Sequence, residues 1–277
     1  MATKKFKCEL CGYIHEGDKA PASCPKCAAP ADAFTEIVEA GAEAPAKKKG
    51  LDTSSNTYTI IYASVMVIIV AFLLAFISSV LKPTQDANVE NDTKGQILTS
   101  LNIDIKASGF NVADEFKNVQ DMLWNGTELV PVPENHKFLS SYGSAIKAGE
   151  LHVFVAQAEG ETKYVLPVTG RGLWGGLWGY IALNADKKTV YGTYFYHESE
   201  TAGLGARIGE RWFQEQFNGK PVFAGENTEA VALKVVKAGA SKAENEIDGV
   251  TGATLTSDGV SAMVQDGLSV YLSFINN

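Results

Sequence analysis

The chain has 277 residues, 45% of them hydrophobic and 20% charged, a composition that allows one moderate globular domain with accessory segments. Its net charge of −8, with no basic stripe beyond one short lysine run, argues against nucleic acid as a partner. All four cysteines lie within the first 27 residues, so disulfide or metal-thiolate chemistry is confined to the N-terminal end.

Two CxxC pairs occur near the N-terminus, Cys8–Cys11 and, after twelve intervening residues, Cys24–Cys27. This spacing places four thiolates where a tetrahedral metal ion needs them, and it predicts a metal site. A pair of disulfides is the alternative, and it is disfavoured if this end of the chain faces a reducing cytosol. Iron and zinc both accept four sulfur ligands, so the spacing does not choose between them.

The residues around the cysteines read FKCELCGYIHEG from position 6 and APASCPKC from position 20. They resemble the short rubredoxin-like module of rubrerythrins. The resemblance implies one iron ion that cycles between two oxidation states in a module of residues 1–38, with Cys8, Cys11, Cys24 and Cys27 as its ligands. The segment between the pairs is shorter than in free-standing rubredoxins, and Ala28 replaces the usual glycine. A structural zinc ribbon therefore remains the alternative.

A predicted flexible linker, residues 39–57, follows the metal module, because Glu39–Gly50 lacks large apolar side chains. Residues 58–81 then contain no charged residue and are dominated by Ile, Val, Leu, Phe and Ala. At about 1.5 Å per residue, this segment can cross a hydrocarbon core of about 30 Å, so it predicts one transmembrane helix. Three lysines precede the span, at positions 47–49, and one follows it closely, which predicts a cytoplasmic N-terminus.

Residues 82–277 are expected to form an extracytoplasmic domain. Runs rich in Val, Tyr, Phe and Thr predict strands in its middle, and helical patterns flank them. The expected helices are 93–102, 112–119, 207–217 and a last one after residue 256, and the expected strands are 151–157, 162–168, 177–183, 189–197 and 231–237. Strands in a run with helices on either side predict an α+β domain with an antiparallel sheet.

The sequence DGVTGATLTS, residues 248–257, precedes the last predicted helix. Ser and Thr before an apolar periodic run are N-cap signals, so we expect the helix to begin near Thr256 or Ser257 and to continue to Ile275. Free backbone N–H groups at such a helix start, next to a Gly-Ala pair, can hold an anion. An ordinary helix cap explains the same residues.

Two glycine-rich clusters lie upstream, GRGLWGGLWGY at 170–180 and HESETAGLG at 197–205. Glycines allow close approach to the backbone, and Leu173 or Trp174 could wall a flat ring; a tight hairpin with two core tryptophans is an equal alternative. In the second cluster the His-Glu pair is more typical of a solvated loop than of a catalytic zinc site. Its glycine-bracketed Leu204 suits contact with a flat ring.

The pattern Asp-x-x-Thr-Gly-Ala-Thr at 248–254 resembles the flavinylation motif of FMN-binding domains in ion-translocating respiratory complexes. That resemblance implies FMN joined to Thr254 by a phosphoester, made by a dedicated flavin transferase. Together with the two upstream clusters, the region from about residue 55 onward resembles the NqrC family of the sodium-translocating NADH:quinone oxidoreductases, with Ala202 where proline is usual. The RnfG family of the Rnf-type complexes shares the single span and the threonine site, and it is the alternative.

The resemblance implies an electron-carrying subunit in a bacterial inner membrane, with a periplasmic FMN domain and other membrane subunits as partners. A cytosolic redox partner is expected for the N-terminal module. No catalytic nucleophile is expected. A zinc ribbon on a membrane-anchored binding protein without a redox role is the alternative from another class. The residues expected to hold FMN are Thr254 (the covalent link), Asp248, Thr251, Gly252, Ala253, Leu255, Thr256, Ser257, Leu173, Trp174, Thr201, Gly203 and Leu204.

Overall fold

The structure, a computed structural model, describes residues 4–37, 53–133, 138 and 142–277. The chain divides into two units, Met1–Ala75 and Phe76–Asn277, and each is described by itself. Most of the predicted linker, residues 39–52, lies outside the described residues.

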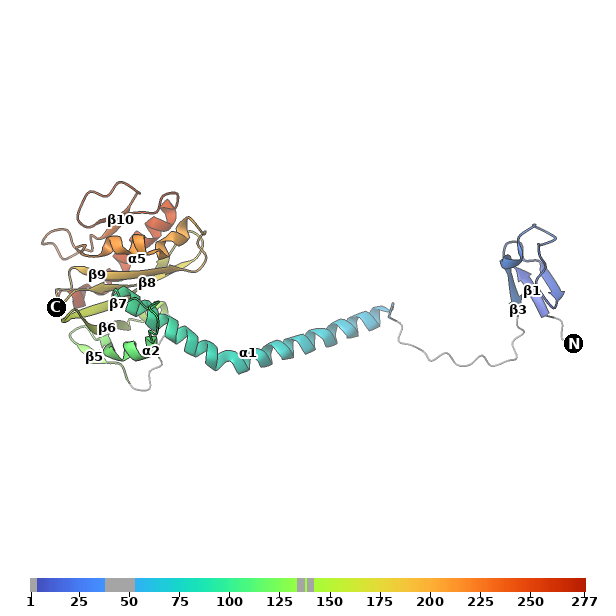
Figure 1. Ribbon diagram of the computed structural model, residues 1–277, viewed down its shortest axis with the longest axis horizontal. Coiled ribbons are helices and arrows are strands. Elements are labelled where there is room, and N and C mark those ends of the chain that lie inside the picture. Colours follow the sequence, from blue (N-terminus) through green and yellow to red (C-terminus); the bar gives the residue numbers. More distant parts are fainter. Residues whose placement is uncertain (1–3, 38–52, 134–137, 139–141) are drawn as a thin grey trace. The chain divides into compact units, whose positions relative to one another are not determined.

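The N-terminal unit contains a three-stranded antiparallel sheet in the order β2-β1-β3 (Figure 1). Its strands are β1 (Lys4–Cys8), β2 (Ile14–Gly17) and β3 (Phe34–Ile37), and the short 3-10 helix η1 (Ala31–Ala33) precedes β3. The buried core is small because it consists of Cys8, Cys24 and Ala29, with partly buried side chains such as Tyr13 and Phe34 around it. A sheet of this size needs a further source of stability.

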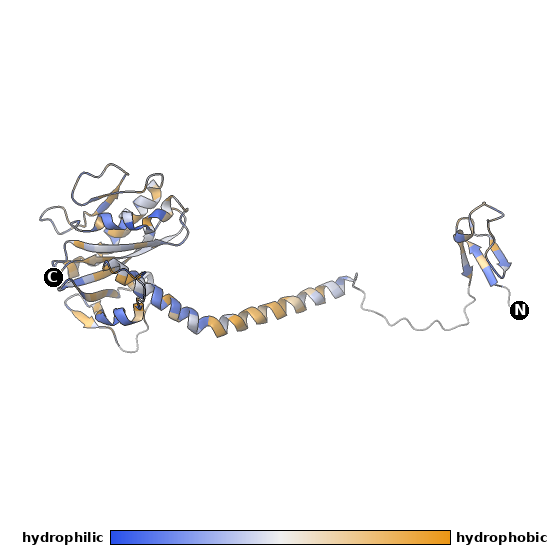
Figure 2. Ribbon diagram, viewed as in Figure 1, coloured by the Kyte–Doolittle hydropathy of each residue, from blue (hydrophilic) through white to orange (hydrophobic). Residues whose placement is uncertain are grey.

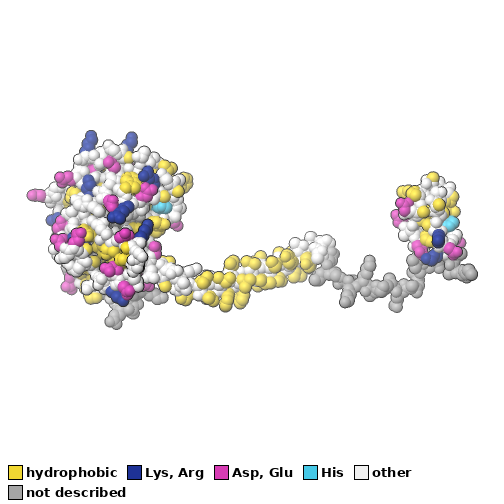
Figure 3. Space-filling model, in the orientation of Figure 1, with side chains coloured by type: hydrophobic (Ala, Val, Ile, Leu, Met, Phe, Trp, Pro, Cys, Tyr) yellow, Lys and Arg dark blue, Asp and Glu magenta, His cyan; other side chains and the backbone are white. Residues whose placement is uncertain are grey.

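Helix α1 (Asn56–Ser100) contains the predicted span. Figure 2 and Figure 3 show a continuous hydrophobic band along it, and side chains from Ile60 to Leu81 are exposed. By length and composition, α1 can cross a membrane. The helix continues beyond residue 81, where the predicted span ends, and passes through Pro83. The separate helix expected at 93–102 is its continuation.

The end of α1 is fixed by packing, which overrides the local effect of the proline. Ile97 and Leu98 are fully buried in a core cluster of the C-terminal domain. An ion pair between Lys94 and Glu90, 2.6 Å apart, spans one turn of the helix just before them.

The C-terminal domain is built on a six-stranded antiparallel sheet in the order β5-β4-β6-β7-β8-β9 (Figure 1). The predicted α+β class with an antiparallel sheet is confirmed. The strands are β4 (Val119–Trp124), β5 (Leu129–Pro131), β6 (Leu151–Ala158), β7 (Glu161–Arg171), β8 (Gly176–Leu183) and β9 (Val190–His197).

Each face of this sheet packs against a different layer. Val153, Leu166 and Ile181 face the larger core cluster, which also contains the helix α5 (Thr254–Ser269) and α6 (Leu272–Ile275). Alternate residues on the same strands, such as Phe154 and Val165, face the cluster that includes the end of α1. This alternation follows from the two-residue period of a strand. Helix α3 (Gly143–Lys147) precedes β6.

Four further expected elements differ from those observed. The helix predicted at 112–119 is a short α2 (Val112–Glu115) and η2 (Phe116–Asn118), followed by β4, which the sequence did not reveal. The helix predicted at 207–217 is divided into η3 (Gly205–Gly209), α4 (Arg211–Gln214) and η4 (Glu215–Phe217). The extended backbone of Glu210 separates η3 from α4.

The strand predicted at 231–237 is shortened to β10 (Lys234–Val236), which pairs in parallel with β11 (Glu246–Asp248), a strand that the sequence did not predict. Val231 and Leu233 are nevertheless buried in the core. The last helix begins two residues earlier than expected and breaks at Val270 and Tyr271. The Tyr271 hydroxyl donates a hydrogen bond to the buried carbonyl of His152, 3.1 Å away, which fixes this break.

Candidate functional site

The four cysteines lie on two similar turns. In the first, the N–H of Gly12 donates to the Cys8 carbonyl at 2.8 Å, and in the second the N–H of Ala28 donates to the Cys24 carbonyl at the same distance. Gly12 and Ala28 both have positive φ angles, 73° and 56°. The position where the sequence departs from the rubredoxin pattern therefore still adopts the left-handed conformation that glycine favours.

The thiol groups fit a tetrahedral metal ion. All four Sγ atoms lie within 4.8 Å of one another, with 3.7 Å between Cys8 and Cys27 and 3.5 Å between Cys11 and Cys24. Metal–sulfur bonds of about 2.3 Å in a tetrahedron place the sulfurs about 3.8 Å apart. Burial opposes ionisation of the Cys24 thiol, but backbone hydrogen bonds from Lys26 and Cys27 outweigh it and lower its pKa to about 7. The thiolate that a metal needs is therefore favoured at Cys24, whereas the neighbouring thiols raise the pKa of Cys27 to about 12.

The second candidate site begins where helix α5 crosses strand β7. A Cβ atom at Gly259 would come within 2.5 Å of the Arg171 carbonyl oxygen, and one at Gly170 within 2.6 Å of the Met263 Cβ. The two glycines let the helix and the strand approach each other closely. The start of α5 therefore lies beside the turn between β7 and β8, where Leu173 and Trp174 stand.

The start of α5 presents backbone donors. Ala253 is its N-cap and makes no side-chain cap hydrogen bond, and Ser257 is the residue whose N–H reaches back to the Ala253 carbonyl, at 2.9 Å. The N–H groups of residues 254–256 precede that bond and have no acceptor within the helix. Gly252, with φ +79°, turns the chain into the helix. The expected anion-binding geometry is present, without the expected Ser or Thr cap.

The four hydroxyl groups of this segment differ in exposure and in hydrogen bonding. Thr256 is buried and donates to the Glu200 carboxylate at 2.6 Å. Ser257 is buried, donates to the Ala253 carbonyl at 2.9 Å and accepts from the N–H of Val250 at 3.0 Å. The side chains of Thr251 and Thr254 are exposed. Of the four, only these two hydroxyls face solvent.

Asp248 faces a different part of the domain. Its carboxylate accepts a hydrogen bond from the backbone N–H of Ser241 at 3.0 Å, and this bond, with others from the same loop, lowers its pKa. Its backbone exchanges hydrogen bonds with the side chain of Gln216. Asp248 thus orders the loop that leads into the site.

Exposed apolar side chains occur on the segments that meet at this site. Trp174 is 66% exposed, Leu255 61%, Leu173 49% and Leu204 43%, a degree of exposure that marks a binding surface when such residues gather. A Cβ atom at Gly252 would lie 3.2 Å from the Leu204 Cδ2, which shows that the 201–205 loop touches the loop before α5. Both Thr201 and Gly203 are exposed in that loop, and Gly203 has φ +77°.

Glu200 is a site residue that the sequence reasoning missed. It is buried and accepts hydrogen bonds from the backbone N–H of Trp174 at 2.8 Å and from Thr256. The hairpin turn, the 197–205 loop and the start of α5 therefore meet at one carboxylate. Its neighbour His197, which the sequence paired with Glu198, instead accepts from the N–H of Glu200 at 3.2 Å.

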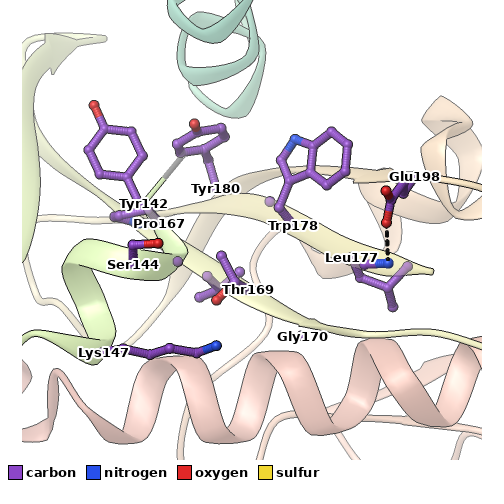
Figure 4. Close-up of a pocket in the computed structure, with 14 residues that line it drawn as sticks. Tyr142, Ser144, Lys147, Pro167, Thr169, Gly170, Leu177, Trp178, Tyr180 and Glu198 are labelled. Carbon is purple, nitrogen blue, oxygen red and sulfur yellow. Dashed lines mark hydrogen bonds between the residues drawn. The ribbon is translucent and has the colours of Figure 1, made fainter. Parts of the chain in front are cut away.

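The β7–β8 turn is a hairpin, but its tryptophans do not form a core. Trp174 is exposed at the tip, and Trp178 donates to Gln96 of α1 at 3.2 Å while its ring packs against Tyr196. Beside this hairpin lies a separate groove of about 420 Å³. The rings of Tyr142, Trp178 and Tyr180, which are among its lining residues, lie on the same side of the strands (Figure 4). None of its lining residues comes from the 248–257 segment.

Comparison with known proteins agrees with both sites. The profile of the FMN-binding domain family matches residues 172–269, and that of the rubrerythrin rubredoxin-like domain matches residues 6–35. The NqrC protein of the Na(+)-translocating NADH-quinone reductase of Haemophilus ducreyi is 30% identical over 230 residues, which cover 76% of this chain and 87% of that protein. The corresponding protein of Chlamydia muridarum is 29% identical, with 79% and 92% covered. The crystal structure of NqrC from Parabacteroides distasonis matches with a TM-score of 0.63 and 35% identity, covering 71% of this chain and 98% of that one.

The α+β fold, the exposed threonine at a helix start and the profile match define an FMN-binding domain, preceded in the chain by a rubredoxin-like metal module. The chain belongs to the NqrC family, whose members are subunits of Na(+)-translocating NADH-quinone reductases. The family resemblance predicted from the three motifs is confirmed. The Rnf-type alternative and the alternative without a redox role are not supported.

Proposed function

We propose that this chain is the electron-carrying subunit of a sodium-translocating NADH-quinone reductase, with FMN attached to the Thr254 hydroxyl. The choice of the Thr254 oxygen rests on how the four hydroxyl groups of residues 248–257 differ in burial and hydrogen bonding. Thr256 and Ser257 are buried and hydrogen-bonded, whereas Thr254 is exposed and is the first residue of α5.

The residues around Thr254 fit a flavin phosphate. In the ester, the Thr254 oxygen replaces one phosphate oxygen, and the remaining charge of about −1 lies where the free N–H groups of residues 254–256 and the dipole of α5 stabilise an anion. Leu173, Trp174 and Leu204 supply apolar surface for the ring, and Thr201 and Gly203 shape the loop that carries Leu204. FMN supplies the one- and two-electron chemistry, while the protein fixes its position.

Intact mass of the full chain, co-expressed with a flavin transferase, tests this assignment. We expect the mass of one FMN ester on the wild type. Thr254→Ala should have no covalent flavin and no fluorescent band in a denaturing gel. A fluorescent band that persists in Thr254→Ala would refute the attachment site.

The topology that we infer has residues 4–37 in the cytoplasm, one membrane span within residues 58–81 of α1, and the FMN domain in the periplasm. The lysines at 47–49, against the single Lys82 after the span, support it. Protease added to intact spheroplasts should digest the FMN domain and leave the N-terminal module protected. The reverse pattern would reject this orientation.

For the metal module we propose iron, bound by the four cysteines, that receives electrons from a cytosolic partner or donates electrons to it. A hydrocarbon core of about 30 Å would separate it from the flavin, so other subunits must connect the two steps. Deleting residues 1–50 should spare quinone reduction by NADH and abolish exchange with that partner. Equal loss of both would reject the separation. A colourless, zinc-containing module would reject iron.

A further inference from the structure

Glu200 lies beneath the exposed residues of the site and connects two of its segments. Its side chain is 7% exposed, and one carboxylate oxygen accepts the N–H of Trp174 at 2.8 Å. The other accepts the hydroxyl of Thr256 at 2.6 Å. The first bond fixes the β7–β8 turn and the second fixes the first turn of α5. One carboxylate thus joins the two segments that carry Trp174 and Thr254.

The packing around the Glu200 carboxylate restricts its side chain to one position. A Cβ atom at Gly205 would come within 2.6 Å of both the Glu200 Oε2 and the Thr256 Oγ1. A Cβ atom at Gly172 would overlap the other carboxylate oxygen. The glycines of the two loops therefore make room for the carboxylate on opposite sides. A side chain held in this way cannot change rotamer without moving a loop.

The Glu200 carboxylate is held in its ionised form. Burial alone would favour the neutral acid, but hydrogen bonds from Thr256 and from the backbone of Trp174 and Gly175 outweigh it, so the pKa is below its ordinary value. A buried carboxylate is tolerated when donors compensate for lost water. The site thus contains a fixed negative charge. The carboxylate that carries it is hydrogen-bonded to Thr256, which lies in the same helical turn as Thr254.

We propose that Glu200 is the positioning residue of the flavin site: its carboxylate holds the 172–175 turn against the start of α5, and its charge lowers the reduction potential of the flavin. The proposal rests on the proposed attachment of FMN to Thr254. A nearby negative charge disfavours the added negative charge of a reduced flavin, because the two repel each other in a partly desolvated site.

Two substitutions in the full chain separate the charge from the hydrogen bonds. Glu200→Gln keeps an acceptor for the Trp174 N–H and can donate to Thr256, but it removes the charge. Thr256→Val keeps the shape and the charge and removes the link to α5. Glu150→Gln, an exposed position before β6, is the charge-matched control.

In the chain without flavin, we expect Thr256→Val to accelerate hydrogen exchange at Trp174 and Gly175 about tenfold, the effect of losing one charge-assisted hydrogen bond. In the flavin-loaded chain, we expect Glu200→Gln to retain the covalent flavin and to shift its midpoint potential to more positive values. Glu150→Gln should leave both measurements unchanged.

The proposal is overturned if hydrogen exchange at the 172–175 turn is the same in Thr256→Val as in the wild type. It is also overturned if the flavin of Glu200→Gln has the midpoint potential of the wild type while Thr254→Ala still abolishes covalent attachment of the flavin. If the wild-type chain takes up no covalent flavin, the proposed function fails by itself. The exchange rates of the chain without flavin then decide whether Glu200 fixes the turn.

Discussion

The two cofactor sites of this chain are built in opposite ways. In the N-terminal module the cysteines are part of the core itself, because Cys8 and Cys24 are two of the three buried residues of its cluster. In the FMN-binding domain the exposed threonine stands outside a large core formed by the sheet and α5. We therefore expect the first site to need a metal in order to fold, whereas the proposed flavin site lies on the surface of a domain with a large core of its own.

Removing the metal is the strongest test of this difference. Without it, residues 4–37 have too little apolar core to offset the entropy of ordering the chain, and structural metals contribute on the order of 10 kcal/mol to such modules. A chelator under reducing conditions should abolish hydrogen-exchange protection in β1, β2 and β3. Protection in β7 and α5 should stay unchanged. A protected N-terminal sheet in the metal-free chain would contradict the comparison.

Substitution of Gly259 tests the scaffold of the second site. Alanine is the better helix former by about 1 kcal/mol, so a position without close packing would gain stability. At Gly259 the new Cβ would press on the backbone of Arg171, and we expect a net loss of about 1–3 kcal/mol in the free energy of unfolding. Denaturant unfolding of the FMN-binding domain measures it.

Asp266→Ala, at an exposed position on α5, is the control for helix propensity and should change the free energy of unfolding by less than about 0.5 kcal/mol. Unfolding of the N-terminal module should be the same in both variants. A stabilising Gly259→Ala would show that α5 can move away from β7, and the flavin site would then not be held as rigidly as the comparison requires.

The sequence predicted the features that depend on local spacing. Two CxxC pairs specify four ligands wherever the intervening chain runs, and an uncharged segment at 58–81 specifies an apolar helix. The strands β6 to β9 were found because β-branched and aromatic residues alternate with clear breaks. Thr254 is predicted through its motif, a signal that does not need the fold.

The features that the sequence did not predict depend on contacts far apart in the chain. Helix α1 continues past Pro83 because its distant end is buried beneath the sheet. Glu200 stands in a loop rich in polar residues, and the family segment that begins at this residue does not show which groups its carboxylate contacts. Its partners Trp174 and Thr256 lie 26 and 56 residues away, so only the fold reveals its role. The glycines at 172 and 205, which make room for it, were the available signal.

The paired turns of the metal module offer a smaller test. Gly12 and Ala28 share the left-handed conformation, which costs an alanine about 1–2 kcal/mol. Ala28→Gly should stabilise the module and Gly12→Ala should destabilise it, each by about 1 kcal/mol, equivalent to about fivefold in the rate of metal loss to a chelator. Among the described residues, and leaving aside its two chain neighbours, no heavy atom lies within 4 Å of a Cβ placed on Gly12, so the effect there is conformational.

Effects of the same sign in the two variants would show that the two turns are not equivalent. Neither substitution should alter unfolding of the FMN-binding domain, because these turns belong to the other unit.

The smallest expected effect concerns acid stability and Glu246, at the start of β11. Hydrogen bonds from the backbone N–H groups of Lys242 and Ala243, at 2.9 and 3.1 Å, and an ion pair with Lys234 lower its pKa from 4.5 to about 2. A depressed carboxyl pKa stabilises the folded state above the unfolded pKa, and this contribution is lost as the pH falls through the folded pKa. The wild-type domain should therefore lose this part of its stability between about pH 4.5 and about 2.

Glu246→Gln cannot titrate, so its unfolding midpoint should depend less on pH across that window and should be lower than the wild type at neutral pH. Chemical denaturation at a series of pH values, followed by tryptophan fluorescence, measures both the unfolding midpoint at neutral pH and its dependence on pH. If the acid dependence of the variant equals that of the wild type, other carboxylates control the acid stability of this domain. The two modules would then differ in how they fold, but the β10–β11 loop would have no part in that difference.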